Sequence, residues 1–209
     1  MTENAEKNEQ QLKMENELLH SQIAIILSQI QPHFLYNTLA AIKEFCKTDS
    51  DMASEMIVDF ANYLRGNMDS LTLNDSILFE KELHHVETYL AIEQKRFKEK
   101  LSVEYDITFR DFKLPALTLQ AAVEHAVRYG ITKKEGKGTV KIKTEISGGN
   151  AVISVSDDGL ADEEQSPHWV ERVHSRLSVM CGGTLSFTSK EGEGNTAVII
   201  IPLKKYLYG

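Results

Sequence analysis

Several features that often reveal a protein's class are scarce in this 209-residue sequence. Its two cysteines, Cys46 and Cys181, lie far apart and have no metal-ligand pattern around them. We therefore expect free thiols in a reducing compartment, with a single long-range disulfide as the less favoured alternative. No apolar run approaches the roughly 20 residues that span a bilayer, and the start, MTENAEKNEQQ, lacks the apolar stretch of a signal peptide. The net charge of -8 is the opposite of the basic excess that nucleic-acid binding needs, so we expect no nucleic-acid partner.

The rest of the composition is that of an ordinary folded protein, with 42% hydrophobic and 26% charged residues. Apolar residues recur at helical spacing in three segments, which predicts helices over residues 9–45, 52–68 and 77–98. Residues 48–50, Thr-Asp-Ser, supply N-cap chemistry for the second of these helices. The apolar stripe of the first helix is typical of a coiled-coil seam, so we expect the chain to self-associate.

After residue 100 the pattern changes to a mixture of strands and helices. Turn signals and alternating residues predict strands at 101–107, 139–146, 151–155, 184–188 and 196–203, with helices at 115–129 and 168–180. The predicted fold class is therefore α+β, with an all-helical domain over residues 1–100 and a mixed α/β layer over residues 101–209.

The strongest functional signal lies at residues 27–39, Leu-Ser-Gln-Ile-Gln-Pro-His-Phe-Leu-Tyr-Asn-Thr-Leu. Pro32 lies inside a helical pattern, where it removes a backbone donor and favours a kink. His33 follows, and Asn37 lies one turn later on the same helix face. A neutral imidazole can attack a phosphoryl group if one ring nitrogen is exposed and a neighbour such as Asn37 fixes its tautomer. Taken without the surrounding residues, the pair favours a structural histidine beside an accidental proline.

The whole segment resembles the phospho-acceptor motif of LytS/YehU-type sensor histidine kinases, Q-I-x-P-H-F-L-x-N-x-L, and meets every fixed position. Residues 79–83 and 89–97 resemble the second conserved block of that family, E-L-x-x-I-x-x-Y-L-x-I-x-x-x-R-F. The resemblance covers roughly residues 20–203. It implies that His33 is the phosphoryl acceptor and that Asn37 belongs to the catalytic site.

The resemblance also implies an architecture and a set of partners. Residues 1–100 would form a homodimeric helical hairpin for dimerisation and histidine phosphotransfer, and residues 101–209 a Bergerat-type ATP-binding domain. ATP and Mg²⁺ are the implied cofactors, and a response regulator with a receiver domain is the implied partner. The implied location is cytoplasmic, as the soluble C-terminal part of a sensor whose upstream region is bound to the membrane.

Residues 123–130 resemble the family signature V-E-N-A-x-K-H-G, with His125 in the place of the Mg²⁺-binding asparagine. An imidazole is a poor ligand for a hard cation that prefers oxygen. Glu124 keeps the carboxylate beside the metal position and is implied to be catalytic. Arg128 keeps the positive charge of the family's lysine and could meet a phosphate.

Residues 157–161 resemble the signature D-N-G-x-G, in which the aspartate reads the amino group of adenine. By this resemblance Asp157 and Gly159 bind the nucleotide, while Ala161 replaces the second glycine, which restricts the backbone if that position needs positive φ. Gly192 and Gly194 resemble a later G-x-G-T turn that completes the site, although alone such a turn predicts a plain hairpin.

The largest departure lies in the glycine-rich lid, which in the family reads G-I-G-L-x-N-V-R-x-R-L. Pro167 and Trp169 replace both lid glycines, and Arg172 takes the asparagine position and is implied to bind the nucleotide. A loop that wraps a triphosphate needs backbone N–H groups that approach it closely, which a proline cannot supply. Without the family, Trp169 is predicted to be a core residue, and His84 and His85 a solvated surface pair.

Two functions stay open from the sequence. In the first, the chain is an active kinase that phosphorylates His33 from ATP and passes the phosphoryl group to a response-regulator aspartate. In the second, it is a non-catalytic dimerisation and signal-relay module whose ATP binding is weak or lost. The three altered signatures, at His125, Ala161 and residues 167–169, motivate the second hypothesis.

Overall fold

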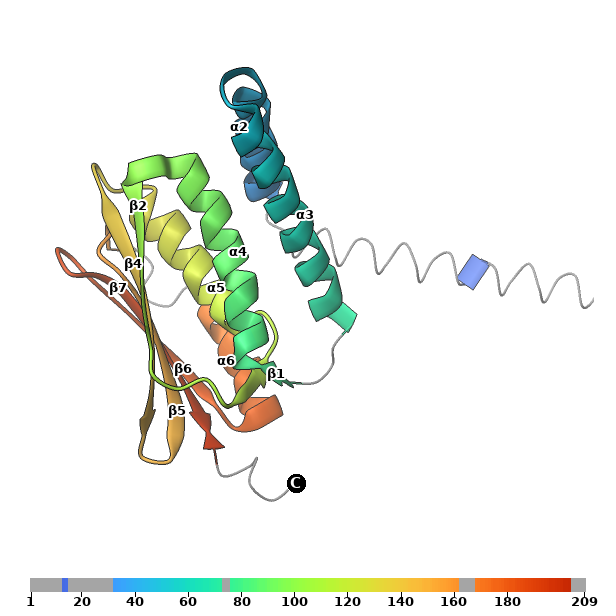
Figure 1. Ribbon diagram of the computed structural model, residues 1–209. Helices are drawn as coiled ribbons and strands as arrows, with labels where there is room; N and C mark the ends of the chain where they lie inside the picture. The colour runs from blue at the N-terminus through green and yellow to red at the C-terminus, as the bar shows by residue number, and fades with distance from the viewer. Residues whose placement is uncertain (1–12, 15–31, 73–75, 162–167, 204–209) are drawn as a thin grey trace, which may run out of the picture. The chain divides into compact units, whose positions relative to one another are not determined.

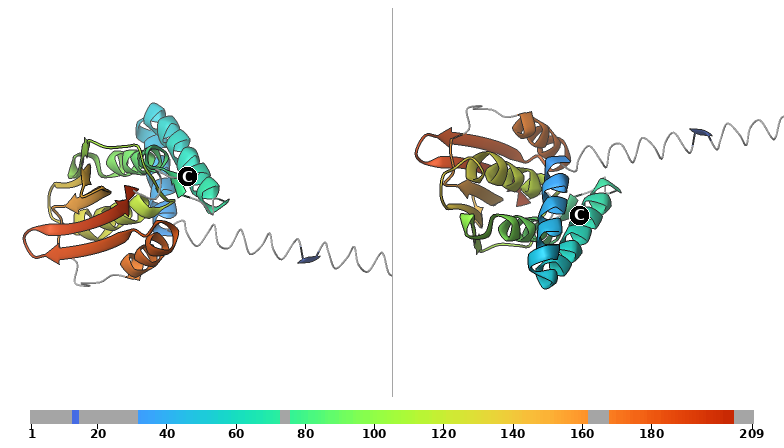
Figure 2. Two further views of the ribbon diagram at one scale, coloured as in Figure 1. Left: turned by 90° about the horizontal axis from the view of Figure 1, so that it is seen from below. Right: turned by 90° about the horizontal axis from the view of Figure 1, so that it is seen from above.

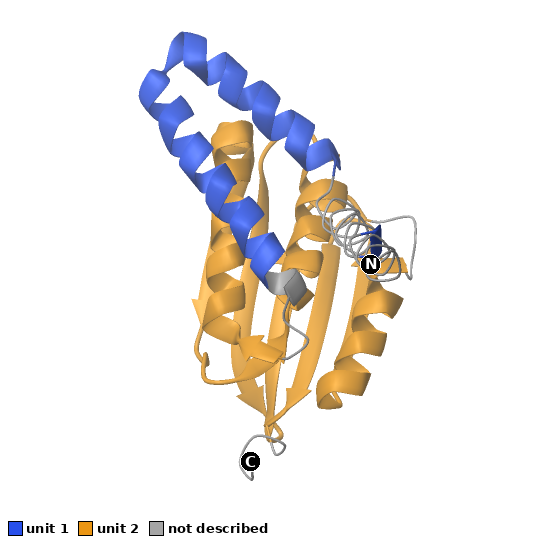
Figure 3. Cartoon of the chain, turned by 90° about the vertical axis from the view of Figure 1, so that its right-hand side faces the viewer, with its two compact units in different colours: residues 1–72 blue, residues 73–209 orange. Residues whose placement is uncertain are grey.

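The computed structural model describes residues 13–14, 32–72, 76–161 and 168–203 of the chain. The chain divides into two compact units, residues 1–72 and 73–209, coloured separately in Figure 3. This division falls earlier than the one at residue 100 that the sequence favours, because helix α4 (Phe79–Phe97) packs with the elements that follow it. No described helix is long and apolar enough to cross a membrane.

The first unit is a helical hairpin of α2 (Pro32–Thr48) and α3 (Ser50–Thr72). Pro32 is the first residue of α2 that the structure describes, and the predicted kink and the helix before it lie outside the described residues. The carboxylate of Asp49 accepts a hydrogen bond of 3.0 Å from the Met52 N–H, which confirms the predicted cap of the second helix. The ring of Phe34 lies 4.7 Å from that of Tyr63 and 6.3 Å from that of Phe60, so aromatic contacts join the two helices.

The second unit is a five-stranded sheet with helices on one face, as Figures 1 and 2 show. The strand order is β2-β4-β5-β7-β6; β2 pairs with β4 in parallel and the other pairs are antiparallel. The strands are β2 (Leu101–Ile107), β4 (Gly138–Ser147), β5 (Asn150–Asp157), β6 (Thr184–Lys190) and β7 (Gly194–Pro202). Helices α4, α5 (Thr118–His125) and α6 (His168–Cys181) cover the sheet.

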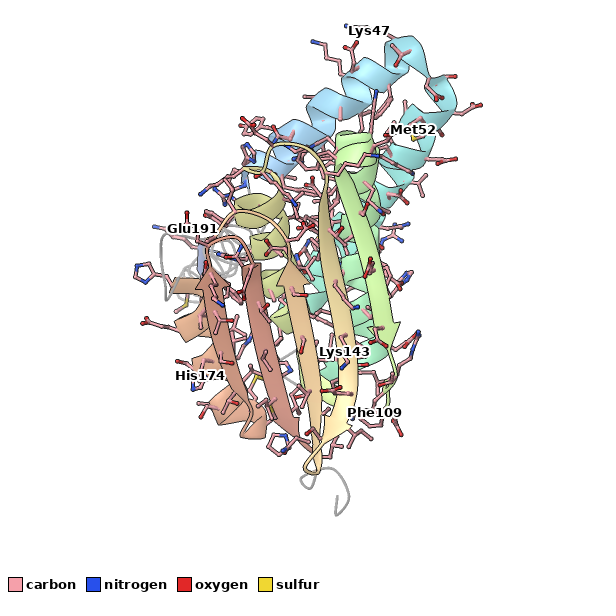
Figure 4. All side chains as sticks on the ribbon, turned by 90° about the vertical axis from the view of Figure 1, so that its left-hand side faces the viewer. Lys47, Met52, Phe109, Lys143, His174 and Glu191 are labelled. Carbon is pink, nitrogen blue, oxygen red and sulfur yellow. The ribbon has the colours of Figure 1, made fainter. Side chains whose placement is uncertain are left out.

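Alternation along the central strands decides which face is covered. In β5 and β7 every second residue is buried beneath the helices: Ala151, Ile153, Val155, Ala197, Ile199 and Ile201. The intervening residues lie on the opposite face, where Figure 4 shows Lys143 on the neighbouring strand β4. The predicted strand pattern is confirmed here, because a half-buried strand has a period of two.

Three local features differ from the sequence prediction. A short ribbon of β1 (Ser76–Leu78) and β3 (Lys113–Pro115) was not expected. The helix predicted at 115–129 begins only at Thr118 and continues from His125 into a π-helical turn, η2 (Ala126–Ile131), which contains Gly130. A short 3-10 helix, η1 (Lys98–Lys100), leads from α4 into the sheet. Of the predicted surface pair, His84 is exposed but His85 is half-buried, and burial lowers the pKa of His85.

Candidate functional site

His33 lies on α2 with its side chain exposed to solvent. The amide nitrogen of Asn37, one turn later, lies 3.1 Å from both Nδ1 and Nε2 of the His33 ring. The structure therefore brings together the two residues that the motif predicts. Because the amide is equally close to both nitrogens, it restrains the ring without selecting one tautomer.

Asp157, at the end of β5, forms the centre of a second cluster. Its Oδ1 accepts hydrogen bonds from the Gly159 N–H at 2.9 Å and from the Asn195 amide at 3.0 Å. The same Asn195 amide donates to the Leu160 carbonyl at 2.8 Å, so one side chain ties the carboxylate to the following loop. Burial raises the pKa of Asp157 to about 6, while these hydrogen bonds oppose the rise. The Asp157 carboxylate is therefore a hydrogen-bond acceptor in a fixed position, and a purine amino group could donate a hydrogen bond to it.

Glycines surround Asp157 because no other residue would fit. A Cβ at Gly130 would lie 2.0 Å from Asp157 Oδ1, and a Cβ at Gly159 would lie 2.2 Å from the Gly130 carbonyl carbon. At Gly194 a Cβ would lie 1.9 Å from the Asp157 carbonyl oxygen, and the φ of +83° also favours glycine. The π-helical turn thereby approaches the β5–α6 loop closely around this carboxylate.

His125 lies in a buried aromatic cluster. Its ring centroid is 4.8 Å from that of Tyr129, 5.1 Å from that of Trp169 and 5.0 Å from that of Phe187. Trp169 also contacts Phe187 edge-on at 5.9 Å, so the start of α6 closes against the end of α5 and strand β6. Only 5% of His125 is exposed. Trp169, which is predicted from the sequence to be a core residue, is only half-buried in this cluster.

The aromatic cluster does not fit Mg²⁺. Rings surround His125, and an imidazole among them offers no oxygen ligand to a hard cation. Among the described residues no group of three or more His, Cys, Asp or Glu side chains could hold a metal ion. Within the described residues, His125 is therefore not a fitting Mg²⁺ ligand.

Glu124 lies in a buried network between α4 and α5. Its Oε1 accepts a hydrogen bond of 2.6 Å from the Gln120 amide. Glu93 of α4 is electrostatically coupled to it and forms an ion pair of 2.8 Å with Arg96. Burial raises the pKa of Glu93 to about 7, and Arg96 opposes this rise. The described contacts of Glu124 are thus with Gln120 of its own helix and, electrostatically, with Glu93 of α4.

The remaining predicted residues are more dispersed. Arg128 is exposed, with its guanidinium 5.0 Å from the Tyr129 ring centre. Arg172 is exposed on α6. Gly192 lies in the exposed β6–β7 turn with a φ of +77° and open space beside it, near Glu191, which Figure 4 labels. Of the predicted nucleotide residues, Asp157, Gly159 and Gly194 are brought together.

Sequence reasoning missed the residue that anchors α5. The carboxylate of Glu82 in α4 accepts backbone hydrogen bonds from Leu117, Leu119 and Gln120 at 2.9, 3.1 and 3.2 Å. It caps the helix from another element, and Leu117 adopts a left-handed φ of +61°. No local sequence pattern marks this role of Glu82, because the contact joins residues 35 to 38 positions apart.

The described chain thus carries an exposed histidine on a helical hairpin and, after it in the sequence, a helix-covered sheet with a buried aspartate at a glycine-lined strand end. Residues 21–101 match the family model described as Histidine kinase. The chain is 33% identical to the putative uncharacterized protein YwpD of Bacillus subtilis (strain 168), over 90% of this chain and 72% of that protein. It is 36% identical to the sensor histidine kinase YpdA of Escherichia coli (strain K12), over 74% of this chain and 27% of that protein.

The sensor protein LytS of Oceanobacillus iheyensis is 30% identical over 73% of this chain and 26% of its own length. The chain therefore spans only about a quarter of these two sensor proteins. Among solved structures, the Acinetobacter baumannii histidine kinase AdeS is 18% identical with a TM-score of 0.48, over 92% of this chain and 97% of that chain. This chain belongs to the sensor histidine kinase family of two-component signalling proteins, and LytS-type kinases are among its relatives.

Proposed function

We propose that the chain is a cytoplasmic transmitter module that takes a phosphoryl group onto His33 and passes it to an aspartate of a response regulator. The observation that carries this proposal is the exposed His33 ring with Asn37 against both of its nitrogens. A solvent-facing imidazole can be reached by both a phosphoryl donor and a protein acceptor. A buried structural histidine would satisfy neither requirement.

The proposed first step is nucleophilic attack by His33. The unprotonated ring nitrogen bonds the γ-phosphorus of ATP, and the bond from that phosphorus to the β,γ-bridging oxygen breaks, releasing ADP. The other ring nitrogen keeps its proton and then releases it to solvent. In the second step the phosphorus–nitrogen bond breaks as a carboxylate oxygen of the response regulator bonds the phosphorus, and the imidazole takes up one proton from solvent and leaves in its neutral form. Asn37 holds the imidazole in place through both steps.

The nucleotide is proposed to bind by its base at Asp157. The carboxylate is buried, fixed by Gly159 and Asn195, and lined by glycines, which suits recognition of an exocyclic amino group. At the position of the family's Mg²⁺-binding asparagine the described residue is His125, which does not fit a hard cation, so no step is assigned to a metal.

Homodimerisation through the hairpin is part of the proposal. Tyr36, Leu39, Ile57 and Met68 are each more than half exposed on α2 and α3, at 74%, 53%, 51% and 51%. Such apolar residues on a two-helix hairpin favour association with a second copy. We also propose that a membrane-bound sensing region acts upstream, since the relatives YpdA and LytS are named as sensors.

One observation favours a second candidate, a non-catalytic relay module. The aromatic cluster around His125 occupies the position from which the family's asparagine would hold the metal. In this alternative the hairpin dimerises and relays a signal, and any phosphoryl group on His33 comes from another kinase.

Labelling with γ-³²P-ATP separates the two candidates. The kinase proposal predicts acid-labile, base-stable label on the wild-type chain and none on His33→Gln. The matched control is His84→Gln, because His84 is equally a histidine on a helix surface, with 83% of its side chain exposed. Label that persists in His33→Gln would refute the role of His33. An unlabelled but folded wild-type dimer would favour the relay module.

A further inference from the structure

Two cationic side chains, Arg128 and Lys133, lie near the ring of Tyr129 in and just after the π-helical turn η2. Arg128 lies with its guanidinium 5.0 Å from the Tyr129 ring centre, and Lys133 places its ammonium 5.2 Å from the same centre. Both side chains are exposed, and within the described part of the chain neither forms an ion pair with a carboxylate. By contrast, Lys134 pairs with Asp158 at 3.2 Å and Lys137 pairs with Glu99 at 3.0 Å.

The Tyr129 ring holds these cations at a defined place. Its centroid is 4.8 Å from the stacked His125 ring, whose own contacts with Trp169 and Phe187 fix it. A cation near an aromatic ring is attracted by the ring's negative face. The same histidine that cannot serve as a metal ligand thereby supports the ring that positions Arg128 and Lys133.

The backbone of the π-helical turn η2 connects the residue that the two cations contact, Tyr129, to the glycine that packs on Asp157, Gly130. Tyr129 is followed directly by Gly130, whose Cα packs so closely on Asp157 that a Cβ would lie 2.0 Å from Oδ1. The π-helical turn thus carries the Asp157 contact at Gly130 and the cation pair around Tyr129. Arg128 and Lys133 therefore lie, along the chain, two residues before and three residues after the glycine that packs on Asp157.

We propose that this site binds adenine nucleotides without a divalent metal, with Asp157 reading the base and Arg128 and Lys133 neutralising the phosphates. The inference rests on the nucleotide site of the proposed function and differs from it in naming what replaces Mg²⁺. Arg128 occupies the position of the family's lysine, whereas Lys133 is a phosphate contact that no family signature assigns. Two protein cations favour ligands in the order of their negative charge, so affinity rises from adenosine through AMP and ADP to ATP.

Calorimetric titration of the full chain tests this inference directly. The expected result is that a non-hydrolysable ATP analogue binds in EDTA at least as tightly as in Mg²⁺, because chelation by the metal removes charge that the protein would otherwise neutralise. Binding is also expected to weaken as salt rises, since exposed charges are screened. Tighter binding in Mg²⁺ than in EDTA would overturn the inference, and so would the absence of binding in both.

Charge-neutral variants identify the residues. Arg128→Gln and Lys133→Gln should each weaken ATP-analogue binding in EDTA by about fivefold while leaving adenosine binding unchanged. Lys137→Gln is the matched control, because it makes the same charge change in the same loop at a lysine that pairs with Glu99. Equal losses in Lys133→Gln and Lys137→Gln would refute a specific role for Lys133.

The calorimetric result is independent of phosphotransfer. Metal-dependent binding together with label on His33 would refute the metal-free inference and keep the proposed function. Metal-free binding without any label on His33 would keep the inference and refute the kinase proposal.

Discussion

Replacing Glu82 should destabilise the second unit more than any other single carboxylate change on α4. Glu82 is 1% exposed and accepts three backbone hydrogen bonds at the start of α5, from Leu117, Leu119 and Gln120. Glu82→Ala leaves these donors without their acceptor in a buried place, and each such donor costs about 1–3 kcal/mol. Arg176, whose charge favours the Glu82 carboxylate, also loses its counterion.

The burial of the charge reduces the net effect. Desolvation is the largest influence on Glu82 and raises its pKa, so removing the carboxyl group also removes an unfavourable burial. We therefore expect Glu82→Ala to lower the free energy of unfolding by about 3–5 kcal/mol. Glu82→Gln keeps one oxygen and should lower it by about 1–3 kcal/mol.

Urea denaturation followed by far-ultraviolet circular dichroism measures both effects. Glu80→Ala is the matched control, since Glu80 lies in the same helix turn but is exposed and pairs with Arg110 at 2.9 Å on the surface. That change should alter the free energy of unfolding by less than about 1 kcal/mol. If Glu82→Ala were no more destabilising than Glu80→Ala, the proposed cap would not hold α5.

Three further predictions follow from the site. Burial raises the pKa of Glu93 from 4.5 to about 7 in the folded chain, so the stability that its protonated form contributes is fully present below pH 4.5 and is lost as the pH rises to 7. Chemical denaturation across this range should show the free energy of unfolding fall by about 3 kcal/mol in the wild type but not in Glu93→Gln. The same pH dependence of stability in both proteins would contradict this prediction. Phe187→Ala should lower stability by about 1–3 kcal/mol and shift the emission of Trp169, the single tryptophan, to longer wavelength; unchanged emission would disprove the contact. Gly130→Ala would place a Cβ 2.0 Å from Asp157 Oδ1 and should weaken calorimetric binding of an ATP analogue by about tenfold or more, a prediction that wild-type affinity would refute.

Local patterns predicted much of the fold. The alternation predicted for residues 151–155 is present in β5, and the cap at Asp49 was visible as a short polar segment before an apolar helix. The resemblance of residues 27–39 correctly joined His33 to Asn37, because residues four apart on a helix are neighbours. Each of these features depends on residues close together in the chain.

Contacts between distant segments could not be predicted in this way. The β1–β3 ribbon pairs two three-residue strands, which are too short to show a period. The capping of α5 by Glu82 joins residues 35 to 38 positions apart. The substitution at His125 was visible in the sequence, but the aromatic cluster also requires Phe187 from a separate strand. The sequence therefore showed that His125 stands in the place of the family's metal-binding asparagine, but it did not show the aromatic cluster that surrounds this histidine.

The most direct test of the central claim is to locate phosphate on the purified wild-type chain after incubation with ATP. Tandem mass spectrometry at neutral pH preserves phosphorus–nitrogen bonds and assigns the modified residue. The account predicts phosphate on the peptide that contains His33, with loss of that peptide's phosphate when a response regulator with a receiver domain is added. An unmodified His33 in a folded chain that binds the nucleotide would contradict the claim that this protein is its own phosphoryl acceptor.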